Sequence, residues 1–230
     1  MLLEFAGIVI DVKNKYKYFE ELCREFEVFD KKADFSVEVT EEIMKKAIND
    51  NPEFPDAYIE SLEIYRIICK KMLDYNAMLM HCAAISVDNK AYLFTAVSGT
   101  GKTTHISLWK KKFGDKCVVV NGDKPIIRLI DNKFYACGTP WRGKENYGTN
   151  TMVPIKAICI LERGENNSIK KIAPHDAIST VITQTLRTND MNEMDKMLSL
   201  TDKLLSSVPF YRLKCNMNDD AADVSYNGMK

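Results

Sequence analysis

Residues 96–104 read Ala-Val-Ser-Gly-Thr-Gly-Lys-Thr-Thr, and they directly follow the apolar run Ala-Tyr-Leu-Phe-Thr at 91–95. Apolar residues recur at helical spacing after Lys102, so the sequence predicts a strand, a glycine-rich turn and a helix. Gly99 and Gly101 let the turn point successive backbone N–H groups at one anion, and the helix N-terminus adds the positive end of its dipole. Nucleotide binding is therefore the first functional hypothesis.

Different residues of this loop are expected to contact different parts of a bound nucleotide. The Lys102 ammonium group can reach the β- and γ-phosphates of ATP, and the Thr103 hydroxyl can ligate Mg²⁺. Position 96, where the usual pattern opens with glycine, is alanine, which costs little unless the backbone there needs a positive φ. A chance glycine-rich turn is the alternative. The predicted phosphate-binding residues are Val97, Ser98, Gly99, Thr100, Gly101, Lys102, Thr103 and Thr104.

Composition and charge narrow the class of protein. Of the 230 residues 46% are hydrophobic, and 32 basic residues balance 32 acidic ones, so no net charge attracts nucleic acid or an anionic membrane. The seven scattered cysteines lie mostly in apolar runs, which favours buried thiols over a disulfide framework or a zinc site. The N-terminus lacks the basic flank of a signal peptide, and no apolar run reaches membrane-spanning length. We therefore expect a cytoplasmic protein without nucleic-acid or membrane partners.

The chain is expected to divide into a small N-terminal α+β lobe, residues 1–53, and a P-loop nucleotide-binding domain, residues 54–230. The run Asn-Pro-Glu-Phe-Pro-Asp at 51–56 punctuates the chain between them. An amphipathic helix over 56–72 would connect the two parts. Within the lobe we expect strands at 6–12 and 34–39, a helix at 16–26, and a second helix capped by Thr40.

The order of elements around the loop is more informative than the loop itself. Two strand patterns at 78–87 and 91–97 are separated by hairpin spacing, and no helical period occurs between Phe113 and Pro174. Further strands are expected at 117–120, 125–130, 134–136, 154–162, 168–172 and 208–213, with helices at 177–186 and 192–206. This pattern predicts an α/β fold whose loop lies in a mixed, largely antiparallel, hairpin-rich sheet, and not one of alternating strands and crossover helices.

The string Ser-Gly-Thr-Gly-Lys-Thr-Thr inside such a sheet resembles the fold shared by phosphoenolpyruvate carboxykinase and HPr kinase/phosphorylase. The loop sequence itself most resembles that of the carboxykinases. The chain length and the stretch His81-Cys82-Ala83-Ala84 resemble the catalytic domain of HPr kinase and its small kinase-like relatives. The resemblance covers about residues 78–175, and it implies ATP- and Mg²⁺-dependent phosphoryl transfer to a hydroxyl group.

Asp123 follows the apolar run at 117–120 and is the strongest candidate beyond the loop. Phosphoryl transfer needs a carboxylate near the metal, and often one that accepts the proton of the attacking hydroxyl. In proteins resembling HPr kinase this strand ends in two adjacent aspartates, which serve as metal ligand and catalytic base. Here the first is Gly122, so Asp123 and Thr103 are the predicted Mg²⁺ ligands and Asp123 is also the predicted base. An ordinary hairpin-turn aspartate is the alternative.

Two histidines lie close to these residues in the sequence. His81 shares a predicted strand face with apolar neighbours, which is typical of a hydrogen-bonded core histidine. The resemblance implies a second role for His81, in which it polarises or orients a phosphate. His105 follows Thr104 in the first helical turn, where we expect a solvent-facing residue, with a place beside the nucleotide as the alternative.

The long glycine-rich stretch 138–148 has no regular pattern, and such loops often carry function. Arg142 and Lys144 could stabilise charge on a transferring phosphoryl group. The pair Arg142-Gly143 also resembles an Arg-Gly pair of the HPr kinase active-site region. The alternative is a surface loop that Trp141 anchors to the core.

Three functions are compatible with these observations. The first is an ATP- and Mg²⁺-dependent kinase acting on a hydroxyl of a protein, a peptide or free serine, with Asp123, Lys102, Arg142 and His81 in catalytic roles. The second is a nucleotide-binding sensor or scaffold, favoured by Ala96 and by the missing acid at Gly122. The third is a carboxykinase-like decarboxylase, for which the chain is short. The acceptor, the choice among ATP, GTP, ADP and pyrophosphate, and assembly into a homo-oligomer stay open.

Overall fold

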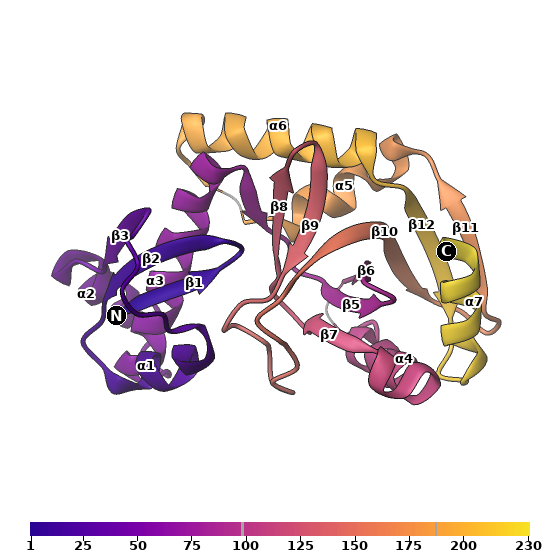
Figure 1. Ribbon diagram of the computed structural model, residues 1–230, viewed down its shortest axis with the longest axis horizontal. Coiled ribbons are helices and arrows are strands. Elements are labelled where there is room, and N and C mark those ends of the chain that lie inside the picture. Colours follow the sequence, from indigo (N-terminus) through magenta and orange to yellow (C-terminus); the bar gives the residue numbers. More distant parts are fainter. Residues whose placement is uncertain (98, 187) are drawn as a thin grey trace.

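The structure, a computed structural model, describes residues 1–97, 99–186 and 188–230. These residues form a mixed α/β protein with seven α-helices, a three-stranded sheet and a curled nine-stranded sheet. Figure 1 shows the three-stranded sheet with its helices at one end of the molecule, and β11, β12 and α7 at the other. Within the described ranges, no helix combines the length and the apolar character needed to cross a membrane.

The N-terminal sheet has the order β1-β2-β3, with β1 and β2 antiparallel and β3 parallel to β2. Ala6 and Gly7 both have positive φ, at 55° and 66°, and form the two-residue turn between β1 and β2. The predicted strand at 6–12 was therefore wrong at its start. Thr40 caps α2 as predicted, because its Oγ1 accepts a hydrogen bond from the Ile43 N–H at 3.3 Å. The elements are β1 (Leu2–Phe5), β2 (Ile8–Lys13), α1 (Lys17–Cys23), β3 (Phe35–Glu38), α2 (Glu41–Asp50) and α3 (Asp56–Met72).

The aromatic core of this region extends beyond the three-stranded sheet. Phe5 and Phe26 meet edge to face with ring centroids 5.9 Å apart, and Phe5 also contacts Trp141 at 6.3 Å. Tyr65 of α3 stacks on Trp141 at 4.0 Å, which ties α3 to the stretch 138–148. Because one buried cluster crosses α3 in this way, the division of the chain at residue 53 stays a prediction.

The large sheet has the order β4-β8-β9-β10-β6-β5-β7, with β12 on the C-terminal half of β10 and β11 on β12. β10 runs parallel to β6 and β12, and the other pairings are antiparallel, which confirms the predicted mixed, largely antiparallel sheet. All residues from Phe113 to Pro174 are described, and no α-helix lies between them. The strands are β4 (Ala77–Leu79), β5 (Ala83–Val87), β6 (Lys90–Thr95), β7 (Val118–Asn121), β8 (Ile126–Ile130), β9 (Lys133–Cys137), β10 (Met152–Arg163), β11 (Ser168–Ile172) and β12 (Phe210–Cys215).

The predicted single strand at 78–87 is two strands. β4 pairs with β8, whereas β5 pairs with β6 and β7, so the chain changes neighbours at Met80–Cys82. His81 lies in this break and not on the apolar face of a continuous strand. A change of partner leaves the backbone of the connecting residues outside the ladder, where the His81 N–H instead donates to the Gln184 carbonyl at 2.7 Å.

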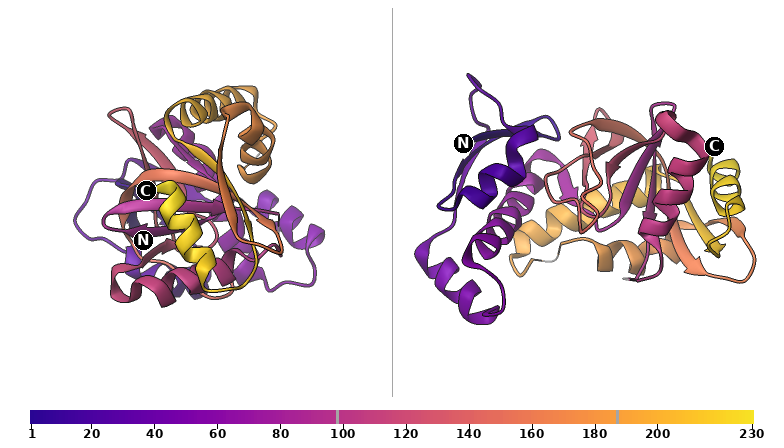
Figure 2. Two further views of the ribbon diagram at one scale, coloured as in Figure 1. Left: turned by 90° about the vertical axis from the view of Figure 1, so that its right-hand side faces the viewer. Right: turned by 90° about the horizontal axis from the view of Figure 1, so that it is seen from below.

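Four helices cover the two faces of the sheet, as Figures 1 and 2 show. Alternate side chains of β6 point to opposite faces: Tyr92 and Phe94 pack with Trp109 of α4, whereas Leu93 belongs to the cluster that holds Leu204 of α6. α4 (Lys102–Phe113) and α7 (Asp220–Met229) therefore cover one face, and α5 (Pro174–Gln184) and α6 (Met191–Ser207) cover the other.

Strand directions bring several chain segments to one edge of the sheet. β7 is antiparallel to β5, which is antiparallel to β6, and β6, β10 and β12 are mutually parallel. The C-terminal ends of β12, β10, β6 and β7 thus lie side by side in that order, with the start of β5 between the last two. This edge receives the loop at 96–101, the turn at 122–124 and the segments at 163–164 and 215–217. Ligands of α/β sheets commonly bind outside such strand ends.

Candidate functional site

The glycine-rich turn lies between β6 and α4, as the sequence predicted. Gly99 and Gly101 have φ of +78° and +119°, in the left-handed region that favours glycine. No atom of the described residues lies within 4 Å of where a Cβ would stand on either, so the space beside both glycines is open in that part of the chain. The Thr100 N–H and hydroxyl both donate to the Val97 carbonyl, at 3.2 and 2.7 Å. Ser98, also predicted to bind phosphate, lies outside the described residues.

Lys102 opens α4, and its side chain folds back along the loop. Its Nζ donates to the Ala96 carbonyl at 3.4 Å, which is a weak contact. Burial lowers the pKa of Lys102, while the negative charge of Asp123 acts in the opposite direction. Thr103 and Thr104 follow in the first helical turn, where the backbone N–H groups have no partner within the helix. This half-buried ammonium, whose contact with the described residues is weak, is placed to meet an anion.

Asp123 belongs to a hydrogen-bonded chain with His81 and Gln184. The Asp123 Oδ1 lies 3.0 Å from the His81 Nε2, and the His81 Nδ1 lies 2.8 Å from the Gln184 side-chain amide. A neutral imidazole that donates from Nε2 accepts at Nδ1, so the Gln184 amide must present its NH₂ group there. The hydrogen bond from His81 lowers the pKa of Asp123, and the charges of Lys124 and Lys102 add to it against the effect of burial. The carboxylate is ionised at neutral pH.

This arrangement speaks against the first alternative for His81, while its predicted role toward a phosphate stays a prediction. Its side chain is 34% exposed and faces a carboxylate, so it is not a core histidine. Its hydrogen bond orients the Asp123 carboxylate and lowers its pKa. Gln184, the third member of the chain, comes from the end of α5, and no signal in the sequence connects it with His81.

Asn121 holds the turn that carries Asp123, and sequence reasoning missed it. The side chain is fully buried, and its Oδ1 accepts hydrogen bonds from the backbone N–H groups of Asp123 and Lys124 at 2.9 and 2.7 Å. Its Nδ2 donates to the Thr139 carbonyl at 3.2 Å and to the Trp141 carbonyl at 3.3 Å. One amide therefore fixes Asp123 against the stretch 138–148. A polar residue that ends the apolar run Val-Val-Val was the available signal.

Gly122 is enclosed on the side where an aspartate would need room. A Cβ there would lie 3.2 Å from the Tyr147 Cβ, 3.3 Å from the Tyr147 carbonyl oxygen and 3.4 Å from the Arg142 carbonyl oxygen. Two of these neighbours are backbone atoms, and the Gly122 N–H itself donates to the Tyr147 carbonyl at 2.8 Å. A side chain at this position therefore requires the Tyr147 segment to shift by a few tenths of an ångström.

We expect Gly122→Asp to lower the free energy of unfolding by about 1–3 kcal/mol, the usual range for overpacking. Chemical denaturation measures this change, and Gly122→Ala isolates the contribution of the Cβ. Unchanged stability of both variants would show that the Tyr147 segment moves aside freely and that a paired carboxylate fits.

Arg142 lines a pocket together with Asp123, and its predicted role in charge stabilisation stays a prediction. Its guanidinium forms an ion pair with Glu25 and lies over the Phe26 ring at 5.4 Å. Only 10% of the side chain is exposed. The guanidinium thus ties the stretch 138–148 to the N-terminal region, because a carboxylate and an aromatic face are both within its reach there. A role in neutralising a transferring phosphoryl group would require this ion pair to open.

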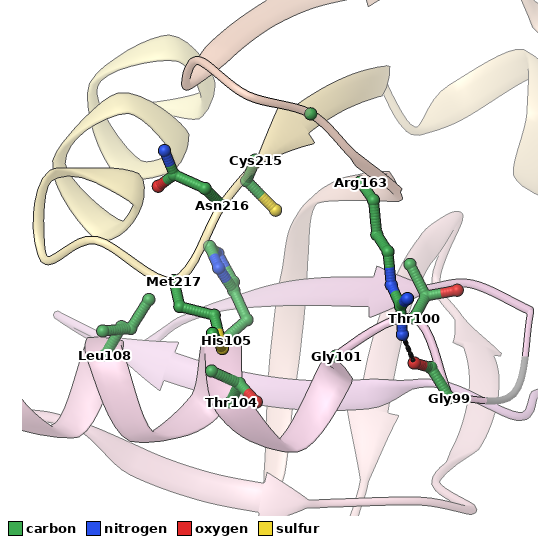
Figure 3. A pocket seen from close by; sticks show the side chains of 11 residues that line it. Gly99, Thr100, Gly101, Thr104, His105, Leu108, Arg163, Cys215, Asn216 and Met217 are labelled. Carbon is green, nitrogen blue, oxygen red and sulfur yellow. Dashed lines mark hydrogen bonds between the residues drawn. The ribbon is translucent and has the colours of Figure 1, made fainter.

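A pocket of about 450 Å³ adjoins the glycine-rich turn at the strand ends of β10 and β12 (Figure 3). The Arg163 guanidinium donates to the Gly99 carbonyl at 2.7 Å across one side of it. Residues Cys215–Met217 face α4 across the other side. The pocket is continuous with the loop because Gly99, Thr100, Gly101 and Thr104 all line it. Arg163 was not a candidate from the sequence, where it was expected to be the first residue of a turn after the strand at 154–162.

His105 also lines this pocket and corrects an expectation. It was expected to face solvent, but the residue is 2% exposed and its Nε2 lies 3.0 Å from the Trp109 indole nitrogen and 3.1 Å from the Ser225 hydroxyl. Burial lowers the pKa of His105 to about 4, so the ring is neutral at physiological pH. The contact with Ser225 of α7, more than a hundred residues away in the chain, gives no signal in the local sequence.

Comparisons with known proteins give a structural likeness only. No model of a known family matches the chain, and no curated protein matches it in sequence. Among solved structures, the chain is similar to the Hpr(Ser) kinase/phosphatase from Coxiella burnetii, with 8% identity and a TM-score of 0.38. The match covers 65% of this chain and 94% of that one. This is at most a likeness of fold.

Proposed function

We propose that the protein is an ATP- and Mg²⁺-dependent phosphotransferase that acts on a hydroxyl group. One observation carries the proposal: a single sheet edge holds an open glycine turn with Lys102 and, two strands away, the Asp123 carboxylate hydrogen-bonded to His81. An anion-binding turn beside a base is the minimum that phosphoryl transfer needs from a protein, because positioning and charge stabilisation do most of the work.

The nucleotide would lie along the edge of the sheet. Its phosphates would meet the backbone N–H groups of residues 99–103 and the Lys102 ammonium, where the dipole of α4 adds positive potential. Its nucleoside would enter the adjoining pocket, whose volume of about 450 Å³ lies within the range of small-molecule sites. Arg163, whose guanidinium donates to the Gly99 carbonyl at 2.7 Å and forms no ion pair with a described residue, joins Arg142 as a candidate for charge stabilisation.

Mg²⁺ would be held by few protein groups. Mg²⁺ binds one or two carboxylates together with substrate phosphates and keeps several waters, so it needs no protein cage. The described residues contain no group of three His, Cys, Asp or Glu side chains that could form such a cage. Asp123 and the Thr103 hydroxyl fit the smaller requirement. When bound, the ion would neutralise charge on the β- and γ-phosphate oxygens.

The chemical step follows from these roles. The acceptor oxygen attacks the γ-phosphorus, a new O–P bond forms, and the bond from the γ-phosphorus to the bridging oxygen breaks, so ADP leaves with that electron pair. The proton of the acceptor hydroxyl passes to the Asp123 carboxylate, whose imidazole partner His81 can stabilise either protonation state. Asn121 keeps the carboxylate in place because its Oδ1 accepts hydrogen bonds from the backbone N–H groups of Asp123 and Lys124.

A nucleotide-binding sensor is the second candidate, and the packing around Gly122 favours it. The turn carries one carboxylate, and a Cβ at Gly122 would lie 3.2–3.4 Å from Tyr147 and Arg142 atoms, so metal binding and proton removal would both depend on Asp123. A protein that binds MgATP with an affinity unaffected by acceptors and transfers nothing would match this alternative.

The proposal is tested by transfer of label from [γ-³²P]ATP with Mg²⁺ to free serine, a serine-containing peptide pool and a carrier protein. We expect acid-stable label on at least one class of hydroxyl acceptor, with release of ADP in equal amount. MgATP binding without label transfer to any class would support the sensor instead.

A further inference from the structure

A second pocket, of about 360 Å³, opens at Asp123 and contains no residue of the glycine-rich turn. We call it the interlobe pocket. Its remaining walls come from α1, α3 and the stretch 138–148. The pocket beside the turn, in contrast, does not include Asp123. Along the sheet edge the order is therefore the nucleoside pocket, the glycine turn, Asp123 and the interlobe pocket, so Asp123 stands between the proposed donor and a separate cavity.

One wall of the interlobe pocket is apolar and aromatic. Tyr18 of α1 and Tyr58 of α3 lie edge to face with ring centroids 6.4 Å apart, and Leu22, Leu62 and Trp141 continue the wall. Tyr18 remains 41% exposed although it is a large ring beside a cavity. Such a wall, with a few polar groups opposite, is typical of a site for a small molecule.

The opposite wall carries an excess of positive charge. Asp123 is the one carboxylate that lines the described part of the pocket, whereas Lys124, Arg142 and Lys144 also line it. Arg142 is neutralised by Glu25, and the Lys124 Nζ lies 3.9 Å from the Asp123 Oδ2. Lys144 is exposed and forms no ion pair with any described residue. Lys144 is therefore the one cation of this wall without a carboxylate partner among the described residues, and its charge favours an anionic ligand.

We infer that the interlobe pocket binds the phosphoryl acceptor, and that this acceptor is a small hydroxylated carboxylate. Its hydroxyl would meet Asp123 and its carboxylate would meet Lys144. The inference rests on the proposed function. In the step, the acceptor hydroxyl gives its proton to Asp123 and the acceptor oxygen bonds to the γ-phosphorus of ATP. The bond from the γ-phosphorus to the bridging oxygen breaks, and ADP leaves with that electron pair. The volume of the pocket limits the ligand to a small molecule, because larger acceptors could place only a side chain there.

The test uses two pairs of compounds that differ in the carboxylate: L-glycerate with glycerol, and L-serine with L-serinamide. ADP release by the full chain is measured at saturating MgATP. We expect kcat/KM to be at least tenfold higher for the carboxylate member of a pair. Lys144→Ala should raise KM for that member about three- to tenfold and leave KM for ATP unchanged, because the lysine meets only the acceptor. Lys45→Ala, an exposed lysine of α2 outside the pocket, is the matched control.

Three results would overturn the inference: equal acceleration by the neutral members, no effect of Lys144→Ala on the acceptor KM, or no acceleration by any of the four compounds while MgATP still binds. Failure of the proposed function has a different signature, since no label from [γ-³²P]ATP would then reach any acceptor, the peptide pool and the carrier protein included. Label transfer to a peptide or a protein, without acceleration by the four small compounds, would show that the inference fails while the proposed function holds.

Discussion

Lys102→Ala is expected to weaken MgATP binding about 10- to 100-fold and to reduce label transfer to background. Among the described residues the half-buried ammonium makes one weak hydrogen bond, to the Ala96 carbonyl, so its charge is available to the phosphates. Hydrogen bonds that involve a charged group contribute about 1.5–3 kcal/mol, and each 1.4 kcal/mol changes an equilibrium constant tenfold. Isothermal titration calorimetry with MgATP measures the affinity.

Lys116→Ala is the matched control for this variant. Lys116 is an exposed lysine just beyond α4, and the same atoms and charge are removed far from the glycine turn. The affinity of the Lys116→Ala variant for MgATP should stay within about twofold of wild type, because an exposed charge more than a Debye length from the phosphates is largely screened. If Lys102→Ala and Lys116→Ala bound MgATP equally well, the loop would not be the phosphate site.

Asp123→Asn is expected to leave MgATP binding within about threefold and to lower the rate of transfer about 10²- to 10⁴-fold, the usual contribution of a general base. The amide keeps the size of the side chain, and its oxygen can still accept from the His81 imidazole. The variant therefore removes the charge and the proton acceptor without opening a cavity. Single-turnover transfer from [γ-³²P]ATP separates the chemical step from binding.

The pH dependence of transfer provides a second check on Asp123. The hydrogen bond from His81 lowers the pKa of the carboxyl group below its ordinary 3.8, so the ionised base persists as the pH falls to that value and is lost only below it. His81→Ala removes the first cause of this shift, and the acid limit of kcat should then move to higher pH. An unchanged acid limit in His81→Ala would contradict the role given to the pair.

Much of the fold could be predicted from local patterns. The strand, glycine turn and helix at 91–113, the hairpin strands at 126–137 and the two C-terminal helices follow from periodicity and turn residues. The errors occur where partners change. The 78–87 segment looks continuous in sequence, yet β4 and β5 pair with different strands, and no single-strand pattern carries that information.

The candidate site was predictable only where one segment supplied the chemistry. The turn with Lys102, and Asp123 at a strand end, were visible in the sequence. Gln184, Arg163 and the Asn121 network depend on strand order and on contacts across many residues, so they appeared only in three dimensions. Arg142 is the opposite case. The sequence suggested a cation that acts on a phosphoryl group, whereas in the fold its guanidinium forms an ion pair with Glu25.

The most direct measurement compares wild type, Lys102→Ala and Asp123→Asn for MgATP affinity and for label transfer in the same preparations. The sheet-edge site predicts that wild type binds and transfers, that Lys102→Ala does neither at the wild-type level, and that Asp123→Asn binds but does not transfer. Transfer that survives in both variants, or affinity for MgATP that Lys102→Ala leaves unchanged, would contradict the assignment of this edge as the site of phosphoryl transfer.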